Sequence, residues 1–246
     1  AGGAIVLMYK WDAGEALKLV EKYKVTAVSG VPIMAREIIN HPDFATTDTS
    51  SLTGLSGGGA QVPPEQVGEI HSKIPAASPA TGYGMTETCG IITSIAGQFF
   101  VDRPDTAGPY MPSFDAKVVD DEGRELPLGE IGELWVRGAP VIKGYLNRAD
   151  ATAETITDGW LHTGDIARID EDKFVYIVDR KKDLVIRGGE NISCTEVEAC
   201  IYRVPGVAEC CVFGVPDPRL GEEIGVAVHM KHGESTTADA IIAHCA

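Results

Sequence analysis

The sequence TGYGMTET combines residue types that can hold a nucleotide. Gly82 and Gly84 permit a tight turn, and Tyr83 offers an aromatic face on which a heteroaromatic base can pack. Thr86 can donate a hydrogen bond to a phosphate, and the Glu87 carboxylate is the kind of hard oxygen ligand that Mg²⁺ prefers. The alternative is an ordinary turn with a surface glutamate, and the segment alone fits both interpretations.

A second candidate is SGGGAQVPPE, residues 56–65, in which three glycines follow a strand-like run. Because glycine has no side chain, the backbone here can approach a flat or anionic ligand closely. A plain strand-to-helix loop also explains the segment. Short glycine motifs often match by chance, so the plain loop is favoured when this segment is taken alone.

The third candidate is a charged run that begins GWLHTGDIAR and ends RKKDLVIRGG. If DEDK forms a two-residue hairpin loop that pairs Asp170 with Lys173, then Asp165 and Arg180 become diagonal neighbours on one face. A carboxylate beside a guanidinium suits a ribose diol, because the carboxylate accepts hydrogen bonds and the guanidinium donates them. The alternative is a surface ion pair that contributes little. His162 lacks a His or Cys partner at metal-ligand spacing, so we expect it to be structural.

Alternating strands and helices must position the first two candidates. Strand-like runs at residues 5–8, 26–31 and 52–59 alternate with helical patterns that begin after Asp12, at Pro32 and at Pro63–Pro64. We expect the first run to be a buried strand, and Asp12 with Glu15 to form a capping pair. Proline is favoured in the first turn of a helix, which supports the two later helix starts. This rhythm predicts a parallel sheet with covering helices.

The pattern changes twice in the rest of the chain. Strand-like runs occur at residues 116–120, 132–138, 160–169 and 174–178, and then at 183–186, 208–215 and 224–230. A helix at 195–204, with Thr195 as its cap, lies among the last three. We therefore predict an α/β fold in three parts. Residues 1–98 belong to an α/β subdomain, residues 99–181 form a β-rich subdomain, and residues 182–246 form a small α+β domain.

Composition excludes several classes of function. The chain has 246 residues, 44% of them hydrophobic, and a net charge of −15, which disfavours binding to nucleic-acid phosphates. Its six cysteines form no Cys-x-x-Cys pair, so we expect reduced intracellular thiols. The apolar run near the N-terminus is too short to span a bilayer and lacks the layout of a signal peptide. We expect a cytoplasmic protein, with the peroxisome as the alternative.

Because these segments occur together and in this order, the chain resembles members of the adenylate-forming superfamily and, within it, the acyl-CoA synthetases. The matching segments are SGGGA, GYGMTET, GELWVRG, GYLN, DGWLHTGDIA, DRKKDLVIRGGENI and EVE, which extend over nearly the whole chain. The resemblance implies an AMP-forming ligase with a large domain, a hinge and a small domain. Its substrates would be ATP, coenzyme A and a carboxylic acid, most often a fatty acid, and Mg²⁺ would accompany the ATP.

The resemblance also implies roles for individual residues. Asp165 would hold both ribose hydroxyls with Arg180 beside them, and Tyr83 would pack on adenine. Thr86 would contact the α-phosphate, and Glu87 would bind Mg²⁺. Further residues of the nucleotide and acyl site would be Gly58, Gly59, Ala60, Gly82, Gly84, Met85 and Ile177.

Three later residues belong to the second half of the implied reaction. Lys182 corresponds to the hinge between the two domains, and Gly188 and Gly189 correspond to the loop beside which the pantetheine thiol enters. Candidates for the acyl tunnel are Val62, Met85, Cys89, Gly90 and Ile91, but they do not specify which acid is used.

The chain also departs from the family pattern. It contains neither the glycine-, serine- and threonine-rich phosphate loop with its lysine nor the catalytic lysine of the small domain. We therefore expect a portion of a longer enzyme, unable on its own to form an acyl-adenylate. Two alternatives stay open. The chain could belong to an adenylation domain that feeds a carrier-protein thiol, or it could be a non-catalytic nucleotide-binding protein. A dinucleotide-dependent oxidoreductase is disfavoured, because no Gly-x-Gly-x-x-Gly follows a strand.

Overall fold

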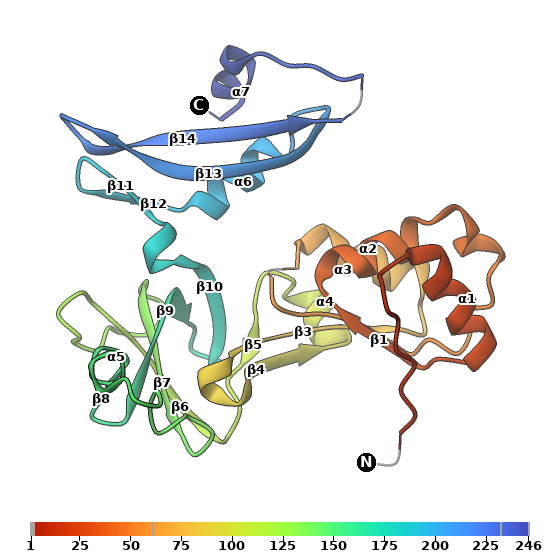
Figure 1. The fold of residues 1–246 in the computed structure, drawn as a ribbon, viewed down its shortest axis with the longest axis horizontal. Helices are drawn as coiled ribbons and strands as arrows, with labels where there is room; N and C mark the ends of the chain where they lie inside the picture. Colours follow the sequence, from red (N-terminus) through yellow and green to blue (C-terminus); the bar gives the residue numbers. More distant parts are fainter. Residues whose placement is uncertain (1–2, 61, 232, 246) are drawn as a thin grey trace. The chain divides into compact units, whose positions relative to one another are not determined.

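The computed structural model of the chain describes residues 3–60, 62–231 and 233–245. In these described residues the structure has three β-sheets and seven α-helices, coloured along the sequence in Figure 1. The chain divides into two compact units. The first consists of Ala1–Ala116, Val136–Leu161 and Ile169–Tyr176, and the second of Lys117–Trp135, His162–Arg168 and Ile177–Ala246. The predicted α/β fold class is confirmed.

The first sheet has the strand order β1-β2-β3-β4. Its strands are Ala27–Gly30, Gly54–Gly57, Ser78–Met85 and Gly90–Ala96. β1 pairs with β2 in parallel, as the alternation of strands and helices predicted. β2 also pairs in parallel with β3, a strand that was not predicted from the sequence. β4 instead runs antiparallel to β3, because only the short 3₁₀ turn η2 (Thr86–Thr88) joins the two strands.

Three helices that follow the predicted starts cover this sheet. They are α1 (Ala13–Tyr23), α2 (Pro32–Asn40) and α3 (Pro64–Lys73). The Asp12 carboxylate accepts a hydrogen bond from the Glu15 amide at 2.8 Å, so the predicted cap of α1 is confirmed. In Figure 1, α2 and α3 lie over the sheet, with α2 packed on β2 and α3 on β3. Their shared core consists of Ala16, Leu17, Val20, Ala35, Ile38, Ile39, Leu52, Leu55, Ile70, Ile74 and Ala77.

The first apolar run of the chain is not a strand. Residues 5–8 have no regular structure, and Ile5 and Leu7 are 82% and 87% exposed. A strand needs a neighbour to satisfy its backbone hydrogen bonds, and in the described ranges no strand pairs with this run. The prediction of a buried strand at residues 5–8 is therefore wrong: the run is apolar, but it is mostly exposed and irregular.

The second sheet has the order β5-β10-β9-β7-β6. Its strands are β5 (Gly108–Pro109), β6 (Phe114–Val119), β7 (Gly132–Gly138), β9 (Trp160–Ile169) and β10 (Phe174–Arg180). The short strand β8 (Ile156–Thr157) pairs with β9. Two helices accompany these strands in the sequence, α4 (Gln98–Asp102) and α5 (Ala149–Thr155). The predicted β-rich character of this stretch is confirmed, and the bounds of β7 and β9 match the predicted runs.

The third sheet has the order β12-β11-β14-β13. Its strands are β11 (Val185–Arg187), β12 (Glu190–Ile192), β13 (Val207–Asp217) and β14 (Gly221–Met230). Helix α6 (Cys194–Ile201) packs on β13, and α7 (Ala238–Cys245) packs beside α6. The core of this sheet contains Val185, Cys194, Ile201, Val204, Val207 and Val212. Within the described ranges, no helix has both the length and the apolar character needed to cross a bilayer.

Helix α6 begins two residues before the expected position. Its N-cap is Ser193, whose hydroxyl oxygen accepts from the Glu196 amide at 3.2 Å, so the predicted cap at Thr195 is wrong. The reason is the buried carboxylate of Asp179. It accepts from the Ser193 hydroxyl at 2.8 Å and from the Thr195 amide at 3.2 Å, and so fixes the start of the helix from outside it.

Replacement of Ser193 by Ala should destabilise the chain by about 2 kcal/mol. Loss of an N-cap costs ~1 kcal/mol, and the buried carboxylate of Asp179 would also lose a donor, which costs a further ~1 kcal/mol or more. The measurement is urea unfolding followed by circular dichroism. Thr195→Ala is the matched control and should change the free energy of unfolding by less than ~0.5 kcal/mol. Equal losses for the two variants would contradict the assignment of the cap.

Candidate nucleotide site

The glycine-rich loop follows β2 at the carboxyl end of that strand. Gly57 packs so closely on Pro32 that a Cβ atom at Gly57 would lie 3.2 Å from it. Gly59 has a φ of +77°, a conformation that side chains disfavour. A Cβ at Gly58 or Gly59 would meet no atom within 4 Å, so this backbone borders open space. Ala60 is exposed as well. The loop can therefore receive a ligand at the edge where ligands of parallel sheets bind.

Gly82 and Gly84 do not form the turn that was predicted for them. Both lie within β3, where they allow the close approach of β4. A Cβ at Gly82 would lie 2.8 Å from the carbonyl oxygen of Thr93, and one at Gly84 would lie 2.2 Å from that of Gly90. The register also shifts between Tyr83 and Gly84, so a bulge lies next to the candidate site. The glycines are thus required for strand packing.

The turn of this segment is η2, and Thr88 anchors it. Its buried hydroxyl accepts from the Met85 amide at 3.2 Å and lies 2.8 Å from the Gly90 carbonyl. Cys89 then reverses the chain with a φ of +53°. This arrangement leaves Thr86 exposed and Glu87 half-buried on the turn. Thr88 is the last residue of TGYGMTET, and no role was predicted for it.

The two segments lie at the same edge of the first sheet. Gly57 is opposite Thr81 in the parallel pair of β2 and β3, and the Thr81 hydroxyl donates to the Gly57 carbonyl at 3.1 Å. The loop 58–60 and the segment 82–87 therefore continue from neighbouring strands in the same direction. Of the proposed acyl-tunnel residues, Val62 is buried in a core with Val67, Ile95 and Phe100, whereas Cys89, Gly90 and Ile91 are exposed and Met85 is half-buried.

Glu87 is held by a neighbour that sequence reasoning missed. The Tyr145 hydroxyl donates to Glu87 Oε1 at 2.7 Å, and the Ile142 amide donates to the Glu87 backbone carbonyl at 2.8 Å. The hydrogen bond to the carboxylate raises the pKa of Tyr145 above its usual range. In the described residues there is no group of three or more His, Cys, Asp or Glu side chains that could hold a metal alone. A single carboxylate does suit Mg²⁺ that is bound mainly through phosphates and water.

In the second unit, Asp165 and Arg180 are neighbours, as predicted. Asp165 Oδ1 lies 3.7 Å from Arg180 Nε, and the side chains are 14% and 63% exposed. The expected loop is wrong, however. The Asp170 amide donates to the Phe174 carbonyl at 3.0 Å, and Lys173 adopts a φ of +67°, which makes a three-residue loop with a bulge. The predicted register is therefore displaced by one residue at the loop.

The strand segment that carries Asp165 is pinned through its backbone. Gly164 adopts a φ of +72°, and its amide donates to Glu133 Oε1 at 3.2 Å. The buried Thr163 hydroxyl donates to the Leu134 carbonyl at 2.7 Å and accepts from the Asp165 amide at 3.1 Å. These contacts fix the backbone on both sides of the carboxylate, so Asp165 is held in position independently of Arg180.

Glu133 also contacts the residue after Arg180. Lys181 Nζ lies 3.3 Å from Glu133 Oε2 and 3.2 Å from Asp121 Oδ1. Burial disfavours the charge on Lys181, but the hydrogen bond with Asp121 and the nearby Glu133 carboxylate outweigh it and raise the pKa of Lys181. Glu133 therefore joins the strand that carries Asp165 to the segment that begins after Arg180. Glu133 belongs to the motif GELWVRG, but the sequence did not indicate that it would contact Gly164 and Lys181.

The remaining predicted residues lie on separate elements of the second unit. Ile177 is half-buried in β10, and Lys182 belongs to the 3₁₀ turn η3 (Lys181–Asp183). Gly188 and Gly189 form the two-residue loop between β11 and β12, where Arg187 pairs with Glu190. Their φ values of +62° and +94° are typical of a type I′ hairpin, which explains the glycine pair structurally. Trp135 stacks on His162 with ring centroids 3.9 Å apart, which gives His162 a packing role.

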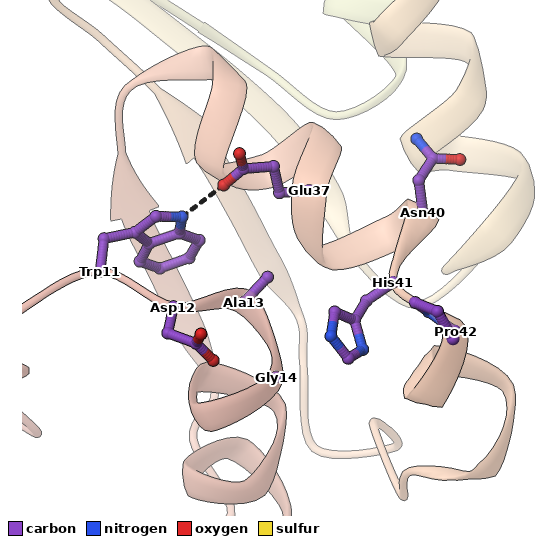
Figure 2. Close-up of a pocket in the computed structure, with 8 residues that line it drawn as sticks. All are labelled: Trp11, Asp12, Ala13, Gly14, Glu37, Asn40, His41 and Pro42. Atoms are coloured by element: carbon purple, nitrogen blue, oxygen red, sulfur yellow. Dashed lines mark hydrogen bonds between the residues drawn. The ribbon is translucent and has the colours of Figure 1, made fainter. Parts of the chain in front are cut away.

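A cavity of about 510 Å³ lies between the first turn of α1 and the end of α2. Figure 2 shows the side chains that line it. The Trp11 indole donates to the Glu37 carboxylate at 2.5 Å, and the Asp12 carboxylate caps α1. The side chains of Trp11, Asp12 and Glu37, which line the cavity, are thus hydrogen-bonded within the protein. None of the predicted nucleotide-site residues lines this cavity, so we do not assign it to the site.

Comparison with known proteins places these motifs in a family. The sequence pattern of the AMP-binding enzymes matches residues 1–146, and that of the AMP-binding enzyme C-terminal domain matches residues 196–246. A feruloyl-CoA synthase of an Amycolatopsis species is 41% identical over 98% of this chain and 49% of its own length. A medium/long-chain-fatty-acid–CoA ligase of Mycobacterium tuberculosis is 37% identical over 98% of this chain and 42% of its own.

Solved structures agree with the sequence matches. The amide bond synthetase McbA from Marinactinospora thermotolerans superposes with a TM-score of 0.88 and 29% identity, over 99% of this chain and 49% of that one. The o-succinylbenzoate–CoA synthetase MenE from Bacillus subtilis, in complex with ATP and a magnesium ion, gives 0.85 and 30%, over 96% and 48%. The chain spans about half the length of the curated relatives it matches. Because the first family pattern alone extends over more than half of its residues, the chain belongs to the AMP-binding enzymes of the adenylate-forming superfamily.

Proposed function

We propose that this chain supplies the nucleotide-binding surfaces and the hinge of an AMP-forming acid–thiol ligase. The observation that carries the proposal is the edge of the first sheet, where the open backbone of residues 58–60 and the turn with Thr86 and Glu87 follow neighbouring parallel strands. Such an edge suits a phosphate-bearing ligand, because it offers the exposed residues Gly59 and Ala60, the exposed Thr86 and the Glu87 carboxylate.

Each group has a definite task in this proposal. Tyr83 packs on adenine, and Thr86 donates to the α-phosphate. Asp165 accepts from both ribose hydroxyls, and Arg180 lies beside them. The remaining positions that border the nucleotide or the acid are Gly58, Gly59, Ala60, Gly82, Gly84, Met85 and Ile177.

The reaction has two steps that balance without an oxidant or reductant. First, a carboxylate oxygen of the acid attacks the α-phosphorus of ATP, and pyrophosphate leaves. Then the sulfur of coenzyme A attacks the acyl carbon, and AMP leaves with the oxygen that came from the acid. Mg²⁺ held beside Glu87 would offset the negative charge of the phosphates. Two different attacks at one site require the protein to rearrange between the steps, and we assign that rearrangement to Lys182.

The acid and the acceptor can be identified in one experiment. We propose an aryl or fatty acid and coenzyme A, because the curated relatives include a feruloyl-CoA synthase and fatty-acid–CoA ligases. The full-length natural protein is incubated with ATP, Mg²⁺ and either ferulic acid or fatty acids of increasing chain length. Thioester and AMP in equal amounts are expected with coenzyme A. Amide formation from an amine, with no thioester, would replace the proposed acceptor.

Asp165→Asn should weaken ATP binding by roughly 10- to 100-fold, since hydrogen bonds to a charged group contribute about 1.5–3 kcal/mol. It should also remove the preference for ATP over 2′-deoxy-ATP, because that preference depends on the diol. Isothermal titration of the full-length natural protein with both nucleotides measures these effects. The matched control is Asp150→Asn, which breaks the exposed 2.9 Å pair with Arg148.

Thermal stability distinguishes a ligand-binding role from a structural one. The Asp165–Arg180 pair is long and its arginine is exposed, so Asp165→Asn should leave the melting temperature nearly unchanged. A variant that binds ATP normally, or one that unfolds, would show that the assignment of Asp165 to the ribose is wrong.

Lys182→Pro should separate the two half-reactions. Proline fixes φ and removes a backbone donor, so it would prevent a hinge movement at this residue. In the full-length natural protein, carboxylate-dependent exchange of pyrophosphate into ATP should persist, while thioester formation should fall by at least ~100-fold, a barrier increase of about 2.7 kcal/mol. Lys182→Ala keeps the backbone free and controls for loss of the side chain. Parallel loss of both activities in the proline variant would place the hinge elsewhere.

A further inference from the structure

The Glu87 carboxylate has a hydrogen-bond partner from a distant part of the sequence, in the same unit of the fold. Tyr145 donates its hydroxyl proton to Glu87 Oε1 at 2.7 Å, and both side chains are half-buried. The two residues are 58 positions apart in the sequence, so the pairing depends on the fold and not on local geometry. Fixing one oxygen of a carboxylate sets the plane of the group, and therefore the direction in which its second oxygen points.

The backbone around Tyr145 is built to hold this hydroxyl in place. The Tyr145 amide donates to the Thr152 hydroxyl oxygen at 2.9 Å, and the Thr152 hydroxyl donates to the Arg148 carbonyl at 2.8 Å. Gly144 packs on Thr152 so closely that a Cβ at Gly144 would lie 2.6 Å from its methyl group. The loop is therefore tied to helix α5 through Thr152. The Ile142 amide, from the same loop, donates to the Glu87 carbonyl, so backbone and side chain of Glu87 are both held.

The chemistry of the partner suits a metal ligand. A neutral phenol orients the carboxylate and leaves its negative charge in place, whereas a lysine or arginine here would neutralise that charge and compete with a divalent cation. Outer partners of this kind fix the geometry of metal ligands, and their loss typically lowers metal affinity 10- to 100-fold.

We propose that Tyr145 is a positioning residue that orients the Glu87 carboxylate toward the divalent cation of the bound nucleotide. This inference rests on the proposed function, in which Glu87 binds that cation. It adds a residue from the GYLN motif to the site, at a position to which sequence reasoning assigned no role. Tyr145 contacts neither the nucleotide nor the reacting atoms in this account.

The test measures metal affinity directly, with Mn²⁺ as the probe. The full-length natural protein is saturated with a non-hydrolysable ATP analogue, and free Mn²⁺ is followed by electron paramagnetic resonance. Tyr145→Phe should lower the Mn²⁺ affinity ~10- to 100-fold, while affinity for the analogue in the presence of EDTA should stay unchanged. Tyr176→Phe is the matched control, because its hydroxyl donates to Asp170 at 3.1 Å in another tyrosine–carboxylate pair of the same unit.

A double-mutant cycle with Glu87→Gln separates the possible failures. If Tyr145 acts through Glu87, then Tyr145→Phe should cause no further loss of Mn²⁺ affinity in the Glu87→Gln background. If the losses of Mn²⁺ affinity in the two single variants add up in the double variant, the inference is overturned. It is also overturned if Tyr145→Phe lowers the affinity for the analogue without metal as much as it lowers the affinity for Mn²⁺. An unchanged Mn²⁺ affinity in Tyr145→Phe, with a loss in Glu87→Gln, would overturn the inference and leave the proposed function intact. If Glu87→Gln itself binds Mn²⁺ normally, the metal assignment to Glu87 fails, and the inference fails with it.

Discussion

The carboxylate of Glu133 accepts hydrogen bonds from Gly164 and Lys181, which are 31 and 48 positions later in the chain. The positions of Asp165 and of the turn after Arg180 depend on these two contacts. One oxygen accepts from the Gly164 amide at 3.2 Å and the other lies 3.3 Å from the ammonium of Lys181. The first contact holds the positive-φ position directly before Asp165, and the second holds the segment directly after Arg180. The ion pair with Lys181 is half exposed and contributes little free energy by itself. Its importance is positional, because the carboxylate that we assign to the ribose and the turn that we assign to the hinge share one anchor.

In the first unit, a residue assigned to the ligand is also held in position by neighbouring groups, but these groups are different. A carboxylate assigned to the ligand, Glu87, is held by a neutral hydroxyl and a backbone amide, while the buried Thr88 hydroxyl closes the turn beneath it. In the second unit, Asp165 is likewise positioned through its backbone, because its amide donates to the Thr163 hydroxyl. In both places the protein fixes the backbone and leaves the negative charge in place. Such preorganisation lowers the cost of binding a cation or a diol, since few groups must reorganise when the ligand arrives.

Sequence predicted the features that depend on local chemistry. The starts of α1, α2 and α3 follow from a capping aspartate and from prolines, and the parallel pairing of β1 and β2 follows from their alternation with helices. It failed where a distant partner decides between local options. Ser193 and not Thr195 caps α6 because of Asp179, and Gly84 serves strand packing because Gly90 of β4 lies against it. The approach of Asp165 and Arg180 was predicted correctly even though the loop that was assumed for it was not.

The most direct test of the account follows the oxygen atoms of the acid. The full-length natural protein would convert a carboxylic acid labelled with ¹⁸O in both carboxylate oxygens, in the presence of ATP, Mg²⁺ and coenzyme A, and the products would be examined by mass spectrometry. One ¹⁸O atom is expected in each AMP, because the oxygen that attacks the α-phosphorus stays with AMP when the thiol displaces it. An ¹⁸O atom in inorganic phosphate, with ADP as the other product, would mean attack at the γ-phosphorus and would contradict the account.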